Sequence, residues 1–309
     1  MKKYVFGPVP SRRLGRSLGV DLVPAKVCTF DCVYCQVGRT TRITTRRERF
    51  TPPEKVVAEI RARLKSAPRP DYITLSGSGE PTLNAAIGEI IDGIKRVTDV
   101  PVAVLTNGSL FYDPEVRRDC ARADVVLPTL DAGDEEVFRR IHRPDPQLTL
   151  ARIVEGLAAF RREFRGQIWL EVFLVAGVNS SPEQVRKLRP LIARIKPDRI
   201  QLNTAVRPTA DPDVKALSEP ELAALSKILG PKAEVIADFR PRITRGRRAS
   251  KAKEDEILDM IRRRPVTLDD IVSGLNLPAE EASKRVEELL AAGRIAKERR
   301  GEKDFFRAL

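Results

Sequence analysis

Residues 19–35 read GVDLVPAKVCTFDCVYC, a short β-branched run followed at once by three closely spaced cysteines. The run GVDLV is typical of a strand, and the cysteines stand in the loop that leaves it. Cys28, Cys32 and Cys35 have the spacing C-x3-C-x2-C. Because a short loop can turn three such sulfurs toward a common centre, this pattern indicates bound metal or an iron-sulfur cluster.

Short β-branched runs alternate with amphipathic helical stretches from Gly19 to about Ile236, which indicates βα units around a parallel sheet. Six strands are predicted in this region. They are GVDLV from Gly19, YITLS from Tyr72, VAVLT from Val102, VVLPT from Val125, IWLEVFLV from Ile168 and RIQLN from Arg199. The predicted fold class is α/β, a partial (β/α)6 TIM-like barrel. In such a barrel the chemistry lies at the carboxyl ends of the strands.

Two helix starts carry the pattern of a capping box with proline at the first helical position. One pairs Thr51 with Glu54, and the other pairs Ser181 with Gln184. Apolar residues in the segments VVAEIRARL and IGEIIDGI recur at helical spacing. We therefore expect each of these helices to lay one apolar face on the sheet.

A second unit is predicted after the barrel. Residues 241–253, PRITRGRRASKAK, lose apolar periodicity and are predicted as a linker between a core over 1–240 and a unit over 254–309. That unit reads helix, helix, helix and β-hairpin, the order of a winged helix-turn-helix, with its recognition helix beginning near Pro278. The helix carries four glutamates against one lysine and one arginine. Nucleic-acid binding and protein docking both stay open, and the charged linker predicts few contacts between the two units.

Bulk composition predicts an ordinary globular chain. It has 309 residues, 42% of them hydrophobic, which is enough for one large domain and a small one. The N-terminal MKKYVFGPVPSRRLG lacks the apolar stretch of a signal peptide, and nowhere do about 18 apolar residues run together. We expect a cytoplasmic protein with no membrane partner.

The net charge of +13 is unevenly placed. Residues 1–50 hold eleven Lys and Arg against three Asp and Glu, whereas residues 245–309 hold sixteen against thirteen. A basic bias around the cysteines would suit a phosphate-bearing substrate. A soluble protein of high pI needs no such partner, so both interpretations stay open.

The fourth cysteine and the only histidine decide between a cluster and zinc. Cys120 stands apart in the charged stretch RRDCARAD and is interpreted as a helix residue, not as a ligand. Structural zinc requires four closed ligands, and here only Cys120 and His142 are left to complete the set. Three cysteines on a cluster leave one iron open, so that a small molecule can chelate it. The cluster is favoured.

The C-x3-C-x2-C motif, with the aromatic Tyr34 directly before its last cysteine, resembles the radical S-adenosylmethionine superfamily. The resemblance implies one [4Fe–4S] cluster on Cys28, Cys32 and Cys35, with S-adenosylmethionine on the open iron. It implies reductive cleavage of S-adenosylmethionine to a 5′-deoxyadenosyl radical that abstracts a substrate hydrogen. It also implies an electron donor such as a flavodoxin or ferredoxin.

Further segments resemble the superfamily in the expected order, each at or just after a predicted strand. Residues 76–82, SGSGEPT, resemble the segment whose carboxylate meets the methionine ammonium, and later segments resemble those that hold carboxylate, ribose and adenine. The resemblance assigns to cofactor binding Tyr34, Gly79, Glu80, Thr106, Asn107, Asp131, Glu171, Asn179 and Asn203.

Within the superfamily the chain resembles the iron-sulfur oxidoreductases related to wyosine base synthase, through GEPTL at 79–83, LTNGSL at 105–110 and LDAGDEEVFRRIHRP at 130–144. That enzyme has additional upstream cysteines, and none precedes Cys28 here. Wyosine formation is therefore not expected. The leading hypothesis is a radical enzyme acting on RNA or another phosphorylated molecule. The alternatives are a peptide- or protein-modifying radical enzyme, and a non-catalytic iron-sulfur regulator that binds DNA.

Overall fold

The computed structural model describes residues 4–237, 254–275, 277–300 and 303–309. Within these ranges one curved sheet has the strand order β1-β2-β5-β6-β7-β8-β9-β10. Only β1 and β2 pair antiparallel, and every other neighbouring pair in this sheet is parallel. The strands are β1 Val5–Ser11, β2 Gly15–Asp21, β5 Tyr72–Ser76, β6 Val102–Leu105, β7 Val125–Leu127, β8 Gln167–Leu174, β9 Arg199–Thr204 and β10 Ala233–Val235.

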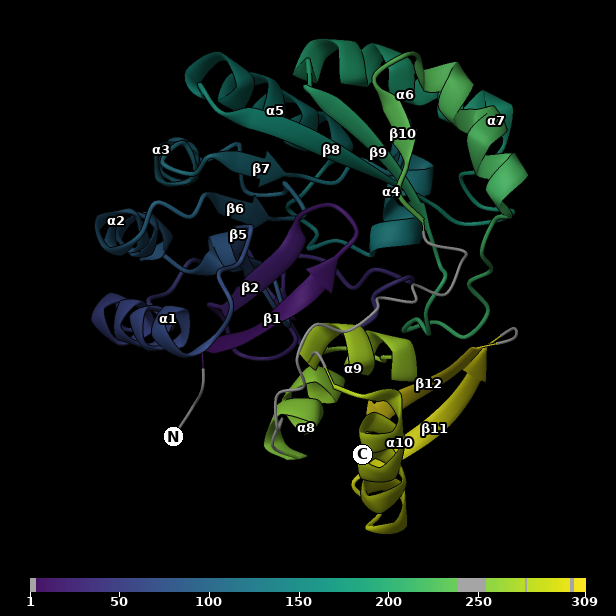
Figure 1. The fold of residues 1–309 in the computed structure, drawn as a ribbon. Helices are drawn as coiled ribbons and strands as arrows, with labels where there is room; N and C mark the ends of the chain where they lie inside the picture. The colour runs from purple at the N-terminus through teal and green to yellow at the C-terminus, as the bar shows by residue number, and fades with distance from the viewer. Residues whose placement is uncertain (1–3, 238–253, 276, 301–302) are drawn as a thin grey trace.

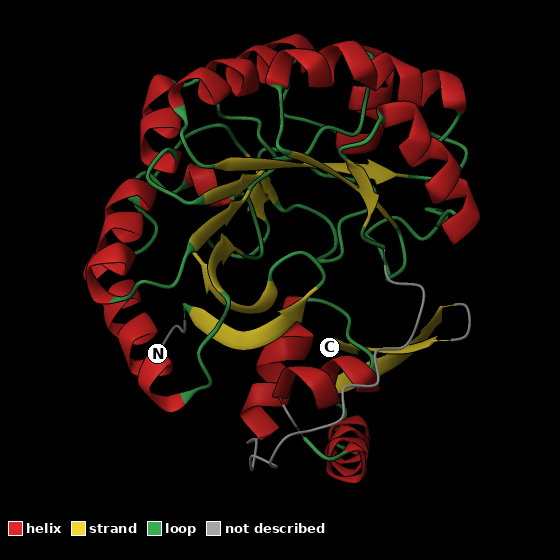
Figure 2. Cartoon of the chain, turned by 45° about the horizontal axis from the view of Figure 1, so that its top comes forward, coloured by secondary structure: helices red, strands yellow, loops and turns green. Residues whose placement is uncertain are grey.

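Helices alternate with these strands and form an arc around the outside of the curved sheet (Figure 2). Each turns an apolar face to the sheet, as α2 does by burying Ile87, Ile90, Ile91 and Ile94. Burial of each such side chain stabilises the fold by roughly 1.5–3 kcal/mol. The helices are α1 Pro53–Ser66, α2 Ile87–Val97, α3 Pro114–Cys120, α4 Glu135–His142, α5 Leu150–Glu163, α6 Pro182–Ile195 and α7 Glu219–Leu229. The predicted α/β partial barrel is confirmed.

All six predicted strands are present, but the sheet has two more. β10 adds three residues at one edge, and β1 adds an antiparallel strand at the other. The sequence predicted no strand before Gly19, and β1 contains Pro8 and Pro10. Proline removes a backbone donor, so it is tolerated only where a strand has one free side, as an edge strand has.

One predicted helix start is correct and the other is wrong. Ser181 caps α6, and its Oγ accepts a hydrogen bond from the backbone N–H of Gln184 at 3.2 Å. Gln184 Oε1 has no hydrogen-bond partner among the described residues, so only this half of the predicted capping box forms. Thr51 does not cap α1, which begins one residue later than expected, at Pro53, with Pro52 in the N-cap position and no side-chain cap. The Thr51 hydroxyl instead accepts from Asn84 Nδ2 at 2.7 Å, so it ties two loops together.

Residues 254–309 follow the predicted order of three helices and a hairpin. They are α8 Glu254–Arg263, α9 Leu268–Leu275, α10 Ala279–Ala291, β11 Ile295–Arg300 and the antiparallel β12 Lys303–Ala308. This C-terminal segment has a core of its own around Ile257, Ile271, Val286 and Phe306. The predicted linker over 241–253 lies outside the described residues. The winged-helix assignment and the division at 240 and 254 stay predictions.

The expectation of few contacts between barrel and C-terminal segment is wrong. Helices α8 and α9 lie against β1 (Figure 1), and Val9 packs on the core of the C-terminal segment. Arg207, after β9, is ion-paired with Asp270 of α9 at 2.8 Å. The prediction rested on the charge of the linker, which carries no information about the surfaces of the two units that it joins. No helix of the described chain is both long and apolar enough to cross a bilayer.

Candidate active site

The cysteine loop is fixed by backbone hydrogen bonds at the carboxyl end of the sheet. Cys28 ends the short strand β3 (Val27–Cys28), which pairs in parallel with β4 (Arg42–Ile43). The backbone N–H of Thr44 donates to the Cys28 carbonyl at 3.0 Å. The carbonyl of Cys35 accepts from Ala210, in the loop after β9, at 2.8 Å. Cys28, Cys32 and Cys35 form no disulfide, and each residue is partly exposed as a whole. The loop is therefore held from two sides.

Each of the three thiols has one nitrogen-bearing side chain close to its sulfur. The neighbours are Asn107 Nδ2 at 3.6 Å from Cys28, His142 Nδ1 at 3.2 Å from Cys32, and Lys26 Nζ at 3.9 Å from Cys35. The Asn107 amide and the Lys26 ammonium donate to their sulfurs. Such donors stabilise a thiolate, and hydrogen bonds of this kind tune iron-sulfur clusters.

The electrostatics of the thiols fit a cationic group. Burial, the Glu80 carboxylate and the Cys35 thiolate raise the pKa of Cys28 to about 12. Burial and the two neighbouring thiolates raise the pKa of Cys32 well above its usual value. Iron binds thiolates and displaces their protons, so its positive charge offsets the repulsion that raises these pKa values. The donor set therefore fits an iron-sulfur cluster.

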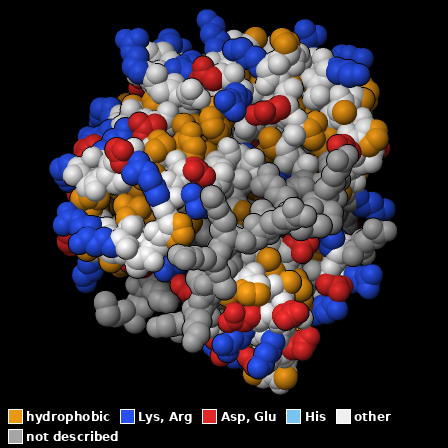
Figure 3. Space-filling view, viewed as in Figure 1, with side chains coloured by type: hydrophobic (Ala, Val, Ile, Leu, Met, Phe, Trp, Pro, Cys, Tyr) orange, Lys and Arg blue, Asp and Glu red, His pale blue; other side chains and the backbone are white. Residues whose placement is uncertain are grey.

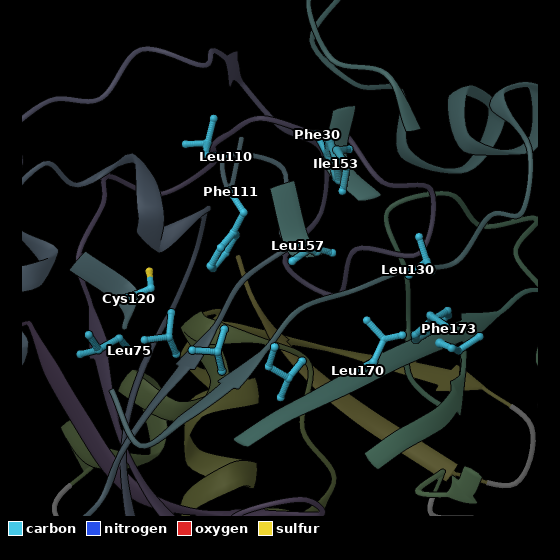
Figure 4. Packing of buried hydrophobic residues seen from close by; sticks show 14 of the residues in the cluster. Phe30, Leu75, Leu110, Phe111, Cys120, Leu130, Ile153, Leu157, Leu170 and Phe173 are labelled. Carbon is cyan, nitrogen blue, oxygen red and sulfur yellow. The ribbon is translucent and has the colours of Figure 1, made fainter. Parts of the chain in front are cut away.

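The zinc alternative finds no support in the arrangement of ligands. Among the described residues no three His, Cys, Asp or Glu side chains converge for a single metal ion. A [4Fe–4S] cluster needs no such convergence, because each thiolate binds a different iron. Cys120 is fully buried in the main core, far across Figure 4 from Phe173, whose ring stacks on Tyr34 beside the thiols.

Glu80 is a buried carboxylate beside the first thiol. It follows β5, is 2% exposed, and accepts hydrogen bonds from the Thr106 hydroxyl at 2.6 Å and the Asn107 backbone N–H at 2.7 Å. Thr82 donates to it from both its backbone and its hydroxyl. Burial raises the pKa of Glu80, and these hydrogen bonds oppose that rise. Within the described part of the chain it has no ion pair, so it fits the predicted ammonium ligand.

Gly79 lets two loops of the site pass each other closely. A Cβ at this position would lie 2.0 Å from the carbonyl oxygen of Val27 and 2.9 Å from Val23 Cγ2. The next residue, Glu80, donates its backbone N–H to the same Val27 carbonyl at 3.2 Å. Only glycine permits this approach. The resemblance assigned Gly79 to cofactor binding. The packing gives an independent reason for a glycine at this position.

Asp131, after β7, links an aromatic group to the second thiol. Its carboxylate accepts from the Tyr34 hydroxyl and from the backbone N–H of Phe173 at 2.6 Å. His142 Nε2 lies 3.5 Å from the same carboxylate, and burial lowers the pKa of His142 to about 3. His142 is therefore neutral at pH 7. Sequence reasoning considered His142 only as a zinc ligand and missed Phe173, which stacks on Tyr34 with ring centroids 4.0 Å apart.

Glu171 and Asn203 face each other from neighbouring strands β8 and β9. Asn203 Nδ2 donates to Glu171 at 2.9 Å, and Arg13 Nη1 lies 3.1 Å from the other carboxylate oxygen. Arg12 donates to Asn203 Oδ1 at 3.2 Å. The two arginines stand in the turn between β1 and β2, so this turn reaches across the barrel. The sequence did not identify them, because no local pattern shows how far a turn reaches.

Asn179 and Thr106 use their polar groups within the protein. Asn179 Nδ2 donates to the carbonyls of Asp131 and Phe173, both at 2.8 Å, and its Oδ1 accepts from the Val175 backbone. Thr106 donates to Glu80, as described above. Both side chains fix the loops that present the site. A direct cofactor contact for either residue stays a prediction.

Comparison with known proteins extends the resemblance over most of the chain. The profile of the Radical SAM superfamily matches residues 22–189. A UPF0026 protein from Helicobacter pylori (strain 26695) is 34% identical over 98% of this chain and 96% of its own length. A protein of Brachyspira hyodysenteriae named GTPase Obg is 37% identical over 96% of this chain, which spans 44% of that relative.

Solved structures agree on the fold. A radical SAM methyltransferase from Sphaerobacter thermophilus superposes with a TM-score of 0.55 at 20% identity, covering 72% of this chain and 67% of its own. The predicted link to wyosine base synthase is left untested by these relatives. The superfamily profile spans the cysteine loop, Glu80, Asn107 and Asp131, and its members are enzymes. This chain, like the UPF0026 proteins with which it groups, belongs to the radical SAM superfamily.

Proposed function

We propose that this chain binds one [4Fe–4S] cluster through Cys28, Cys32 and Cys35 and cleaves S-adenosylmethionine at it. When bound, the cluster supplies the electron that cleaves the sulfonium and starts radical chemistry. That electron would come from a flavodoxin or ferredoxin in the cytoplasm. The fixed loop with its three free cysteines, each beside a nitrogen-bearing side chain, supports the assignment.

A single observation carries the proposal: Asn107 connects the buried carboxylate to the first thiol. Its backbone N–H donates to Glu80 at 2.7 Å, and its side-chain amide lies 3.6 Å from Cys28 Sγ. A ligand that gives its ammonium to Glu80 would therefore lie beside the cluster position. Chelation of an open iron by the methionine end of S-adenosylmethionine requires this adjacency. A charge-assisted hydrogen bond to Glu80 would contribute roughly 1.5–3 kcal/mol.

The remaining predicted residues would hold the nucleoside end of S-adenosylmethionine. Glu171 and Asn203 stand side by side and Tyr34 is clamped by Asp131, so these groups are orientated before any ligand arrives. The stacked rings of Tyr34 and Phe173 would exclude water beside the thiols. Preorganised groups of this kind position a ligand at a low entropic cost.

The substrate that we propose is RNA or another phosphorylated molecule, but the outer basic surface is weak support for it. Arginines near the cysteines are largely neutralised by acidic neighbours, and Figure 3 shows Lys and Arg dispersed over the view instead of gathered in one patch. The ion pairs are Arg39–Asp31, Arg42–Glu48, Arg47–Asp119 and Arg49–Glu89. The support comes instead from a group of arginines that line one cavity beside the cysteine loop, Arg12 and Arg264 among them.

Anaerobic reconstitution tests the proposal. The protein would be incubated with iron, sulfide, dithionite and S-adenosylmethionine, and 5′-deoxyadenosine would be measured by chromatography. We expect it to form with the unaltered chain and with Cys120→Ala, and not with Cys28→Ala. A fully iron-loaded protein that forms none would favour the non-catalytic regulator.

A further inference from the structure

A cavity of about 790 Å³ lies between the inner side of the barrel and the C-terminal segment. The barrel contributes Ser17 and Thr74, and Gln36 borders it one residue after Cys35. Asp270 and Ser273 of α9 form part of the opposite wall. The cavity therefore extends from the cysteine loop to the C-terminal segment, and its volume is typical of a small-molecule site.

Four arginines from three separate parts of the sequence line this cavity. They are Arg12 and Arg13 from the turn between β1 and β2, Arg207 after β9, and Arg264 between α8 and α9. The first three bond to Asn203, Glu171 and Asp270 respectively. Among the residues that the structure describes, Arg264 has neither a hydrogen bond nor an ion pair.

Arg264 stands in an unfavourable electrostatic environment. Burial and the neighbouring charge of Arg207 lower its pKa to about 9, with further repulsion from Arg12 and Arg13. Asp270 attracts Arg264 but cannot compensate fully, because Arg207 donates to both of its carboxylate oxygens. An anion in the cavity would relieve this repulsion.

We propose that Arg264, together with Arg12 and Arg207, binds the phosphate group of a small phosphorylated substrate in this cavity. The inference rests on the proposed function and narrows its substrate class. Guanidinium groups suit phosphate because their planar N–H donors match its oxygens. A substrate held there by its phosphate would extend its reacting end toward Gln36 and the thiols.

The cavity favours a small molecule over an RNA strand. Helix α10, the predicted recognition helix, contributes Ser283, Val286 and Glu287 to the cavity wall. This face of α10 therefore lines the cavity, so the helix does not present it freely to a nucleic-acid groove. The helix also carries two glutamates in its first turn, Glu280 and Glu281, which would repel a phosphate backbone.

The test is calorimetric titration of inorganic pyrophosphate and of adenosine 5′-monophosphate into the full chain, prepared without iron. We expect Arg264→Gln to weaken binding about tenfold or more, the loss typical of a charged hydrogen bond. Arg262→Gln is the matched control, since the Arg262 side chain is 60% exposed in the last turn of α8. This variant should bind both ligands as the unaltered chain does. Equal affinity in the Arg264 variant, or an equal loss in the control, would overturn the proposal.

Thermal unfolding separates ligand binding from a structural role. Without phosphate, Arg264→Gln should unfold at the same temperature as the unaltered chain or higher, because like charges are removed. A lower unfolding temperature would show that Arg264 serves the fold and would overturn the proposal. So would binding of an RNA oligonucleotide in the absence of binding of either small phosphate.

These measurements use neither cluster nor S-adenosylmethionine. A chain that binds pyrophosphate through Arg264 but assembles no cluster would refute the proposed function alone. A chain that forms 5′-deoxyadenosine but binds no phosphate would refute only the inference drawn here.

Discussion

Arg207 donates hydrogen bonds to both carboxylate oxygens of Asp270, at 2.8 and 2.9 Å, and thereby joins the barrel to the C-terminal segment. The two side chains are only 12% and 18% exposed, so this ion pair is shielded from solvent. Arg207 also donates to the carbonyl of Pro265 at 3.0 Å. The pair fixes α9 against the loop after β9 and so holds the wall of the cavity in place.

Asp270→Asn should loosen the C-terminal segment, because Arg207 then keeps its charge in a shielded position without a partner. We expect the free energy of unfolding to fall by about 2 kcal/mol, less than the roughly 3–5 kcal/mol of a fully buried pair, because both side chains keep some exposure. Limited proteolysis and hydrogen exchange over residues 254–309 would measure it. Glu280→Gln, a substitution of an exposed acid on α10, serves as the control. Equal cleavage rates in the two variants would contradict this role for the ion pair.

The same pair predicts a dependence on pH. Burial would raise the pKa of Asp270, but the hydrogen bonds and charge of Arg207 outweigh burial and hold that pKa at about 2. This pKa lies below the value of about 3.9 for an aspartate in the unfolded chain. The contribution of the ion pair to stability is therefore complete above pH ~4 and disappears as the pH falls toward 2. The difference in unfolding free energy between the unaltered chain and Asp270→Asn should therefore shrink as the pH falls from about 5 to about 3. A constant difference would exclude this linkage.

Each of Cys28→Ala, Cys32→Ala and Cys35→Ala should lose the cluster, because removing one thiolate opens a second iron. Cys120→Ala should retain it, since Cys120 is fully buried at the end of α3 and does not belong to the cysteine loop. Iron content and visible absorbance after anaerobic reconstitution distinguish the four variants. Loss of iron from the Cys120 variant to the same extent would refute the ligand assignment.

Glu80→Gln should keep the cluster and weaken S-adenosylmethionine binding about tenfold or more, because the ammonium loses a charged acceptor. Anaerobic calorimetric titration measures the affinity. Glu89→Gln is a suitable control, since Glu89 is an exposed residue of α2 that pairs with Arg49. Unchanged affinity in the Glu80 variant would assign Glu80 to the support of its loop.

The sequence predicted the parts of the site that lie within one short segment each. Cys28, Cys32 and Cys35 share a loop, and Glu80 and Asn107 each follow a recognisable strand, so local patterns were enough to nominate them; their roles as ligands stay predictions. The sequence did not identify Arg13 and Phe173, because both belong to the site through contacts made across the barrel. The prediction that Thr51 caps α1 failed because the helix begins at the second of two adjacent prolines, and because the Thr51 hydroxyl accepts from Asn84 instead.

The position of β1 at the end of the sheet has a consequence for solubility. An edge strand offers unpaired backbone groups to other molecules, which promotes aggregation. Pro8 and Pro10 remove two donors from β1, and α8 and α9 pack against it, with Gly274 allowing close approach to Pro10. The C-terminal segment thus shields this edge. A chain shortened before residue 254 would expose β1 and Val9 together, and we expect it to self-associate through that strand.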